Sequence, residues 1–321
     1  ALFFGLGVTT FAASLRGAAR PALGLGLAAL LAFNLVWVGR DLFTTWPALE
    51  RVQQAYNGRS GALARHIDNT AGSLPTVACV PTSAPRGTIS DAQRIILMMN
   101  RSETALRFAD CGTGLVLTQG GERQQVIFTE PDTLARMPDV LRRWLDEGQM
   151  LTGDGLPPDG VMVVDVAQTL ADQIGMFTTT APAAYAPEAP GGAVEVFPPV
   201  RFGGNITFLG YEPDTTGTYK PGDVVPLVTY WRVDGPPPPD MRLFAHILAD
   251  PASIAAQNDT ISVLPRSLRA RDVFIQITFV TLLESTPPGE YDVSIGAYQD
   301  SDKTRMAVLD SDDQQRGTRL F

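Results

Sequence analysis

The chain has 321 residues, 45% of them hydrophobic, and it carries 25 basic and 34 acidic side chains for a formal net charge of −9. The length allows about two soluble domains, and this acidic balance excludes a protein that holds nucleic acid by a basic surface. Three arginines lie within residues 1–40, where no acidic residue occurs, so the remaining sequence is more acidic still and offers no polybasic patch for anionic lipid.

Two apolar segments flank a short basic loop at the beginning of the sequence. Residues 1–15 and 22–39 are apolar except for a few Thr, Ser and Asn side chains, and the loop RGAARP lies between them. The second segment reaches the roughly 20 residues that cross a bilayer core, and the first is about one turn shorter. The sequence therefore predicts a transmembrane hairpin over residues 1–44, with one or two membrane-crossing helices. A buried soluble hairpin and a signal peptide are the alternatives, but a signal peptide has a single short apolar run.

The charges of this hairpin indicate its orientation. Arg16 and Arg20 lie in the loop, and the positive-inside bias places such a loop in the cytoplasm. Trp37 and Trp46 then lie near the outer interface, where amphipathic rings are favoured. We therefore expect a cell-membrane protein with most of its chain outside the cytoplasm. Because the sequence starts without Met inside an apolar run, we also expect the C-terminal part of a longer protein or a processed one.

Residues 45–180 alternate helical and extended patterns. Helical spacing over 46–67 precedes an apolar strand at 74–80, and a helix at 91–100 starts at the N-cap candidate Ser90. A helix pair broken at Pro138 is expected later, and further strands are expected in ALRFADCG, QQVIFT and GVMVVDV. Strands that alternate with helices predict a small α/β domain with a partly parallel sheet.

The two cysteines, Cys79 and Cys111, each lie at or near the end of a predicted strand. Outside the cytoplasm a disulfide is the expected state of such a pair. The bond would close a loop of some thirty residues, worth about 3–4 kcal/mol in the chain-entropy model. A metal or redox pair is the alternative, but the sequence has neither a Cys-x-x-Cys motif nor a His close to either cysteine.

No residue is assigned a catalytic, cofactor-binding or metal-binding role. The sequence contains no Gly-x-Ser-x-Gly, no His-x-x-x-His and no phosphate-binding loop. We expect His246 to be a packed or rim residue of a strand, and Asp165 to be a helix-capping residue at the end of its strand. The acidic residues 300–313 lack the spacing of a calcium loop, which favours a solvated loop. Whether the chain is part of an enzyme stays open.

The composition changes after residue 180. Residues 181–198 are rich in Pro, Ala and Gly, which predicts a semi-extended linker. Residues 199–321 then show seven or eight short strands separated by turns, with Pro-Gly pairs at 221–222 and 288–289. This spacing predicts a two-sheet β-sandwich of immunoglobulin-like size. The expected strands are NITFLGYE, VVPLVTYWRV, MRLFAHILAD, ISVL, DVFIQITFVTLLE, GEYDVSIGAYQ and RMAVLD.

Aromatic side chains of this region have two interpretations. Tyr211, Tyr219 and Trp231 form a candidate platform for stacking on sugar rings. Tyr230 and Trp231 are adjacent on a strand, however, so we expect one of the two rings to point inward. Aromatic side chains of a sandwich belong to the core more often than to a platform, and we expect the segment to be scaffold.

Several segments resemble a known family. The pieces YKPGDVVPLVTYWRV, RLFAHILAD, AAQND and PPGEYDVSIGAYQDSDKTRMAVLD resemble the C-terminal sandwich that follows the membrane part of bacterial glycosyltransferase-like proteins of the dolichyl-phosphate-mannose mannosyltransferase type. The upstream order of membrane helix, amphipathic helix and small α/β domain is also similar, so the likeness covers most of residues 20–321. The resemblance implies common ancestry and an outer location for this region.

The sequence also departs from the family. A Pro-Thr-x-x-Trp segment of the family is replaced here by ISVLPRSLRARDVF, and the outer loop that holds the family's catalytic acid lies in a region that this sequence does not contain. The resemblance therefore transfers no catalytic residue.

Three functions follow as expectations. The first is a non-catalytic, membrane-anchored outer module that acts as an accessory or structural subunit of a larger membrane protein or complex. The second is the C-terminal part of a membrane glycosyltransferase, and the third is a carbohydrate-binding module. The expected partners are membrane lipid and other membrane subunits, with carbohydrate as an alternative and nucleic acid excluded.

Overall fold

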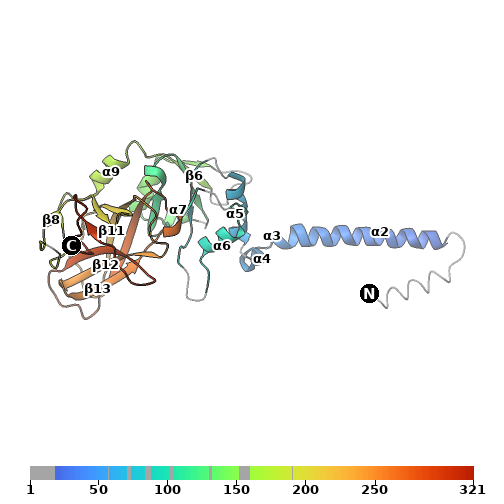
Figure 1. The fold of residues 1–321 in the computed structure, drawn as a ribbon. Coiled ribbons are helices and arrows are strands. Elements are labelled where there is room, and N and C mark those ends of the chain that lie inside the picture. Colours follow the sequence, from blue (N-terminus) through green and yellow to red (C-terminus); the bar gives the residue numbers. More distant parts are fainter. Residues whose placement is uncertain are drawn as a thin grey trace. The chain divides into compact units, whose positions relative to one another are not determined.

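The computed structural model describes residues 19–56, 58–70, 74–83, 88–101, 105–129, 132–151, 160–189 and 191–321 (Figure 1). The chain divides into two compact units, one that ends at Arg59 and one that runs from Ser60 to Phe321. The first apolar segment, residues 1–15, lies outside the described residues, so the first helix of the predicted hairpin stays a prediction.

The described part of the N-terminal unit contains a long apolar helix. α2 (Ala19–Arg40) continues through a π-helical turn, η1 (Asp41–Thr45), into α3 (Trp46–Ala48), and α4 (Glu50–Ala55) follows. Pro21–Ala48 has the length and composition to cross a membrane. An 18-residue stretch of it has a mean hydropathy of 2.0, and none of that stretch is buried. This helix therefore differs from the core helix of a soluble protein, which would bury one face.

The larger unit begins with a mixed sheet. Its order is β2-β1-β4-β6-β5; β1 runs parallel to β2 and β4, whereas β6 runs antiparallel to β4 and β5. The predicted α/β pattern with a partly parallel sheet is present. The strands are β1 (Thr76–Cys79), β2 (Leu106–Ala109), β4 (Gln124–Phe128), β5 (Gln149–Leu151) and β6 (Val161–Val164).

Successive side chains of each strand point to opposite faces of the sheet. Both faces of this sheet carry buried apolar side chains, and each face is covered by other elements. One face packs on α5 (Gly58–Thr70) and α6 (Asp91–Met98), through residues such as Ile67, Ala78 and Ile95. The opposite face, which includes Val77 and Phe128, belongs to the main core together with α8, η3 and α9. The helical elements between β3 and β7 are η2 (Thr118–Gly120), α7 (Thr133–Arg136), α8 (Asp139–Arg142), η3 (Arg143–Leu145) and α9 (Leu170–Phe177).

Two predicted helix signals are confirmed. Ser90 caps α6: its Oγ accepts a hydrogen bond from the backbone N–H of Gln93, and the Gln93 side chain accepts one from the backbone N–H of Ser90. This reciprocal pair satisfies two backbone donors at the start of the helix. Pro138 separates α7 from α8, as its missing N–H and fixed φ require.

The second half of the unit is rich in antiparallel strands. A six-stranded sheet has the order β16-β9-β10-β11-β14-β3, and a three-stranded sheet has the order β13-β12-β15. The two sheets contact each other through an apolar cluster that includes Val225 and Val280 of the first sheet and Ala245 and Ile247 of the second. The strands are β9 (Val200–Phe202), β10 (Ile206–Tyr211), β11 (Val224–Val233), β12 (Met241–Asp250), β13 (Ser253–Thr260), β14 (Val273–Thr281), β15 (Asp292–Gln299) and β16 (Val308–Leu309).

One predicted strand is wrong. ISVL, residues 261–264, contributes only an isolated bridge between Val263 and Ala109, although Ile261 and Val263 are buried. The strand lies just before it instead: β13 pairs with β12 and has a largely polar sequence. The apolar residues 261–264 belong to a buried loop. β13 lies at the edge of its sheet, where a strand needs few apolar side chains.

Strand β3 (Gly114–Leu117) connects the two halves of the larger unit. It comes from the α/β part of the sequence, yet it pairs antiparallel with β14 in the six-stranded sheet. The predicted boundaries at 180 and 198 are therefore crossed by strand pairing and by a shared core that contains Leu115, Trp144 and Trp231. These contacts differ from those of two separate soluble domains. The sequence did not predict them, because a four-residue strand carries no signal for its partner.

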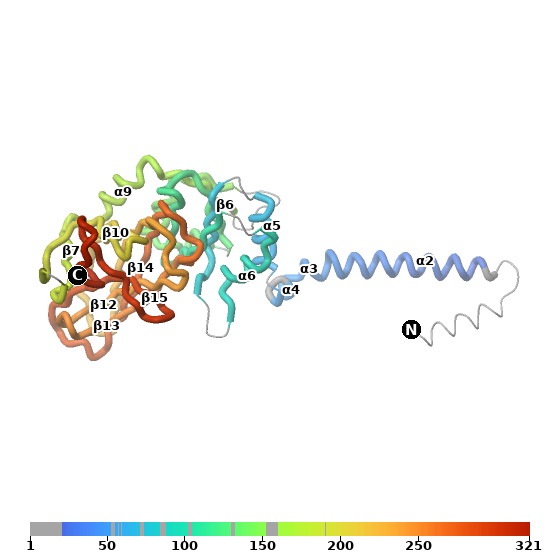
Figure 2. Tube along the Cα trace, viewed as in Figure 1, coloured from blue at the N-terminus to red at the C-terminus, as the bar shows by residue number. Residues whose placement is uncertain are grey.

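The segment predicted as a linker also makes regular contacts. β7 (Ala183–Ala184) pairs with β8 (Glu195–Val196), and Ala184 exchanges two backbone hydrogen bonds with Phe321 at the C-terminus. Figure 2 shows β7 beside the C-terminus. Tyr185 and Ala189 are buried in the main core. Small alanine side chains allow the segment to pack closely against neighbouring strands. A composition rich in alanine is also typical of linkers, so composition alone did not distinguish the two.

Tyr230 and Trp231 are both buried, which corrects the expectation that one ring points inward. Trp231 packs on Phe202 and Phe274 in the core of the six-stranded sheet, whereas Tyr230 faces Trp144 on η3, with ring centroids 5.9 Å apart. β11 is a central strand with protein on both faces. The prediction assumed that one face of β11 is open to solvent. The α/β part covers that face, so Tyr230 is buried as well.

Candidate functional site

The cysteine pair is a disulfide. Cys79 ends β1, Cys111 lies in the turn between β2 and β3, and their Cα atoms are 5.2 Å apart. The bond confirms the pairing expected from the sequence and ties the mixed sheet to the turn that leads into the six-stranded sheet.

Removal of this bond tests its contribution to stability. The Cys79→Ala/Cys111→Ala double variant is expected to lose about 3–4 kcal/mol of unfolding free energy, since the bond spans a sequence separation of 32 residues and restricts the unfolded chain. Urea unfolding of the oxidised protein and of the double variant measures this difference. Equal midpoints and equal slopes would contradict the prediction.

The three residues of the candidate sugar platform do not share a surface. Trp231 is only 1% exposed, and a buried ring cannot stack on a sugar, so its place in the platform is corrected to the core. Tyr219 is half-buried, and its hydroxyl donates to Asp214 at 3.0 Å. Tyr211, also half-buried, stacks on Phe208 and is the one member of the three that lines a cavity.

That cavity, here called the edge pocket, has a volume of about 300 Å³ and is lined by Tyr211, Glu212, Asp214, Tyr291 and Asp292 among other residues. Tyrosine rings beside carboxylates suit a neutral ligand with many hydroxyl groups, because the rings offer flat apolar faces and the carboxylates accept hydrogen bonds.

Part of this polar lining is already engaged. Glu212 accepts hydrogen bonds from Arg143 and from the Tyr230 hydroxyl, and Arg143 also donates to that hydroxyl at 2.8 Å. Burial and the neighbouring carboxylate raise the pKa of Tyr230, so its hydroxyl keeps its proton. This cluster fixes the α/β part against β11 and leaves Asp214 and Asp292 as the exposed carboxylates of the pocket.

A larger cavity lies beside α6. It has a volume of about 700 Å³ and combines apolar residues with three arginines, Arg101, Arg266 and Arg269; we call it the arginine groove. Ile89, Ile96, Leu97 and Met99 come from α6 and its ends, Leu106 and Phe108 from β2, and Leu264 from the segment before η4 (Pro265–Ser267).

Asp68 on α5 positions one wall of the arginine groove. Its Oδ2 accepts hydrogen bonds from the backbone N–H of Asn100 at 2.9 Å and from the Asn100 side-chain amide at 3.0 Å, and its Oδ1 accepts the N–H of Arg101 at 3.2 Å. The bond from the Asn100 backbone, the largest influence, and the donors beside it lower the pKa of the Asp68 carboxyl. The segment that carries Arg101 is thereby tied to α5.

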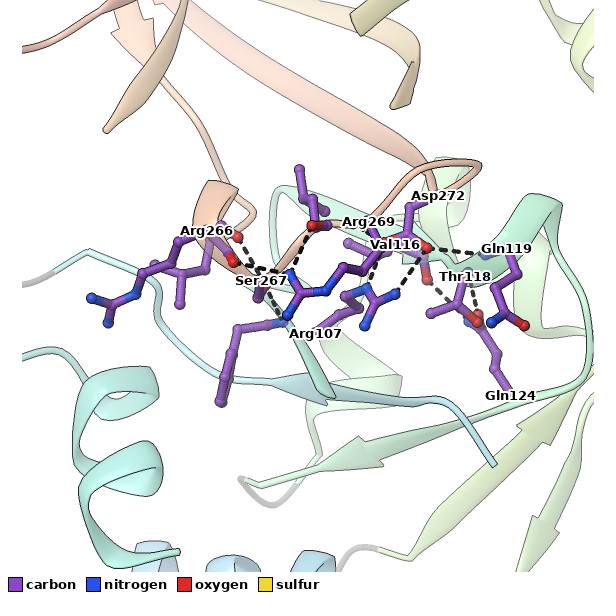
Figure 3. A network of polar contacts seen from close by, with 12 residues as sticks. Arg107, Val116, Thr118, Gln119, Gln124, Arg266, Ser267, Arg269 and Asp272 are labelled. Carbon is purple, nitrogen blue, oxygen red and sulfur yellow. Dashed lines mark hydrogen bonds and ion pairs between the residues drawn. The ribbon is translucent and has the colours of Figure 1, made fainter. Parts of the chain in front are cut away.

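A buried ion pair positions the opposite wall (Figure 3). Asp272 accepts hydrogen bonds from the Arg107 guanidinium, from the backbone N–H of Gln119 at 3.0 Å and from the backbone N–H of Arg269 at 2.8 Å. Ser267 adds a second tie, because its Oγ accepts the N–H of Phe108 on β2 at 3.3 Å. The loop 265–269 is thus fixed to the mixed sheet.

The arginines of the groove lack the carboxylate partners that ten other arginines of the described residues have. Within the described residues, Arg101, Arg266 and Arg269 form no ion pair with a carboxylate. Arg269 donates to the carbonyl oxygens of Arg266 and Leu268. In Figure 3 the Arg266 side chain extends to the side opposite Asp272. Arginines that do pair are Arg94, Arg107, Arg142, Arg143, Arg201, Arg232, Arg242, Arg271, Arg316 and Arg319.

Comparison with models of known protein families found no match to this chain, and a search of curated proteins found none either. The resemblance to the outer region of bacterial glycosyltransferase-like proteins therefore stays a prediction, and the sites are interpreted from their geometry alone.

The remaining candidate residues have structural roles. His246 is buried on β12 with its Nε2 3.2 Å from Asp259 Oδ1 and its ring beside Phe244, as expected of a packed strand histidine. Asp165 accepts the N–H of Ala167 at 3.3 Å but caps no helix, which corrects the expectation, because the next helix, α9, has Thr169 at its N-cap position. Across the part of the chain that the structure describes, no group of three or more His, Cys, Asp or Glu side chains is arranged to hold a metal ion.

The wall held by Asp68 is expected to loosen at acidic pH. A carboxyl whose pKa is lowered in the folded state contributes stability above its unfolded pKa, about 3.9, and loses that contribution as the pH falls through the lower folded value. Amide exchange at Asn100 and Arg101 should therefore accelerate below about pH 4 relative to other helix-end amides. In Asp68→Asn the same amides should exchange faster at neutral pH, with little further change on acidification.

Sequence reasoning missed the arginine groove and excluded a basic patch. Arg101 is more than 160 positions from Arg266 and Arg269 in the sequence, so no local run of basic residues marks the site. The local sequence offers only the apolar residues of the predicted helix at 91–100, of which Ile96 and Leu97 are exposed.

Proposed function

We propose that this chain is a membrane-anchored module whose larger unit lies outside the cytoplasm and acts as an accessory or structural subunit of a membrane protein or complex. We infer that α2 crosses the membrane and that the two antiparallel sheets form an immunoglobulin-like sandwich.

The observation that carries this proposal is the combination of an exposed apolar helix with a disulfide-bonded unit. Side chains such as Leu25, Leu35 and Val36 of α2 are mostly exposed, which is unfavourable in water and favourable in a bilayer. Disulfides form in oxidising compartments and are rare in the cytoplasm. Helix and disulfide together support an anchor with its folded unit on the outer side.

Membrane association and orientation can be measured together. In sealed membrane vesicles of known orientation, the chain should resist extraction by carbonate, and protease should digest residues 60–321 only from the outer side. The cysteines should react with maleimide only after reduction. Release by carbonate would contradict anchoring, and digestion only from the cytoplasmic side would contradict the orientation.

Purification in a mild detergent then separates the two membrane functions. Co-purification with other membrane subunits in a fixed ratio would support the accessory role. A single longer polypeptide that contains this sequence would instead favour the C-terminal part of a membrane glycosyltransferase, in line with the resemblance in the sequence.

The edge pocket supports carbohydrate binding as a second candidate function. Tyr211 and Tyr291 line it beside the exposed Asp292. Calorimetric titration with chitohexaose, mannohexaose and cellohexaose tests this candidate. Tyr211→Ala should remove any binding observed, whereas Tyr56→Ala should leave it unchanged, because Tyr56 belongs to the N-terminal unit and does not line the pocket. The absence of binding to all three sugars would favour the accessory role alone.

A further inference from the structure

Within the part of the chain that the structure describes, the arginine groove joins arginines that form no ion pair to exposed apolar side chains. We propose that it binds one anionic lipid, with the headgroup on Arg101 and Arg266 and part of a hydrocarbon chain along the apolar lining. This inference rests on the proposed membrane anchoring, because the bilayer would supply the ligand.

The charge of the groove matches an anionic headgroup. Arg101 and Arg266 are exposed, and within the described residues neither forms an ion pair, although the chain as a whole is acidic. A guanidinium offers several N–H donors in a planar fork that fits the oxygens of a phosphate. Two such groups from opposite walls can bind one headgroup between them.

The apolar lining matches a hydrocarbon chain. Leu97 is 73% exposed, and Ile89 and Ile96 are exposed beside it; Phe108 and Leu264 line the cavity between the walls. A volume of about 700 Å³ lies within the range of pockets for small ligands, about 300–1,000 Å³. Hydrocarbon in this cavity would remove exposed apolar surface from water.

A lipid fits the groove better than other anions do. Free phosphate would pair with the arginines and leave the apolar lining in water, whereas an acidic peptide would match the charges but brings little hydrocarbon. The chain also limits the distance to a bilayer. Eleven residues lie between Ala48, where the apolar helix ends, and Ser60, where the larger unit begins, and they span at most about 40 Å.

Binding can be measured on the full chain in a mild non-ionic detergent. Dioctanoyl-phosphatidylglycerol should bind with a stoichiometry of one, detected by native mass spectrometry and by titration. Dioctanoyl-phosphatidylcholine, glycerol phosphate and inorganic phosphate should each bind at least tenfold more weakly. Equal affinity for the two lipids, or phosphate binding as tight as that of the anionic lipid, would overturn the proposal. Tighter binding of a glutamate-rich peptide would identify a protein-docking site instead.

Matched variants locate the site. Arg101→Gln/Arg266→Gln should weaken phosphatidylglycerol binding at least tenfold. Arg123→Gln/Arg271→Gln removes the same charge from exposed arginines outside the groove and should leave the affinity within twofold. Equal losses in the two double variants would mean attraction by net charge alone and would overturn the assignment.

The apolar half of the site has its own pair of variants. Leu97→Gln should weaken binding several-fold, whereas Met176→Gln on α9, at a side chain that is 72% exposed, should have no effect. An unchanged affinity in Leu97→Gln would exclude the hydrocarbon part of the proposal. These titrations need no bilayer, so failure to bind lipid is distinguishable from failure of the vesicle experiment on anchoring.

Discussion

Trp231→Ala is expected to lower the unfolding free energy of the larger unit by about 3–5 kcal/mol. The ring is 1% exposed, and its centroid lies 5.3, 5.2 and 6.3 Å from those of Phe202, Phe208 and Phe274. Alanine would leave a cavity between the strands that hold these rings, and rigid strands close such a cavity only in part. The variant would also remove the hydrogen bond from the indole Nε1 to Thr229 Oγ1.

Circular dichroism in urea measures this loss without relying on the fluorescence of the deleted ring. Phe279→Ala is the matched control: Phe279 lies on β14 in the same sheet, but its side chain is 41% exposed, so its loss should be much smaller. Equal losses for the two variants would mean that Trp231 is not the packing centre of the sheet.

Local patterns in the sequence predicted the features that depend on neighbouring residues. The capping box of α6, the break at Pro138 and most strands of the second half follow from side-chain chemistry within a few positions. The disulfide followed from the number of cysteines and the expected compartment. Each of these signals involves few residues, and the structure contains each feature.

Features that depend on distant pairing could not be predicted in this way. β3 is four residues long and joins β14 from far along the sequence, and its pairing places the α/β part over the second face of β11. Tyr230 is buried for that reason. The same contact brings residues 264–269 beside β2 and α6, so the arginine groove exists only after the two halves have associated.

Asp272→Ala is expected to cost about 3–5 kcal/mol, because it removes one partner of a buried ion pair. Asp272 is completely buried and Arg107 nearly so. Without the carboxylate, the guanidinium would keep a buried charge that no anion balances, and the N–H groups of Gln119 and Arg269 would lose their acceptor. The cost is therefore larger than that of one hydrogen bond.

Arg107→Met should cost less than Asp272→Ala, because the carboxylate would still accept hydrogen bonds from two backbone N–H groups. The guanidinium also has one buried nitrogen, Nη1, without a hydrogen bond among the described residues, so its removal relieves part of the cost of burying it. Glu122→Gln at the exposed Arg271–Glu122 pair is the control and should cost less than about 1 kcal/mol. Urea unfolding of the three variants should give this order. If Arg107→Met proved the costlier of the two buried changes, the arginine rather than the aspartate would organise the contact between the mixed sheet and the loop that forms the groove wall.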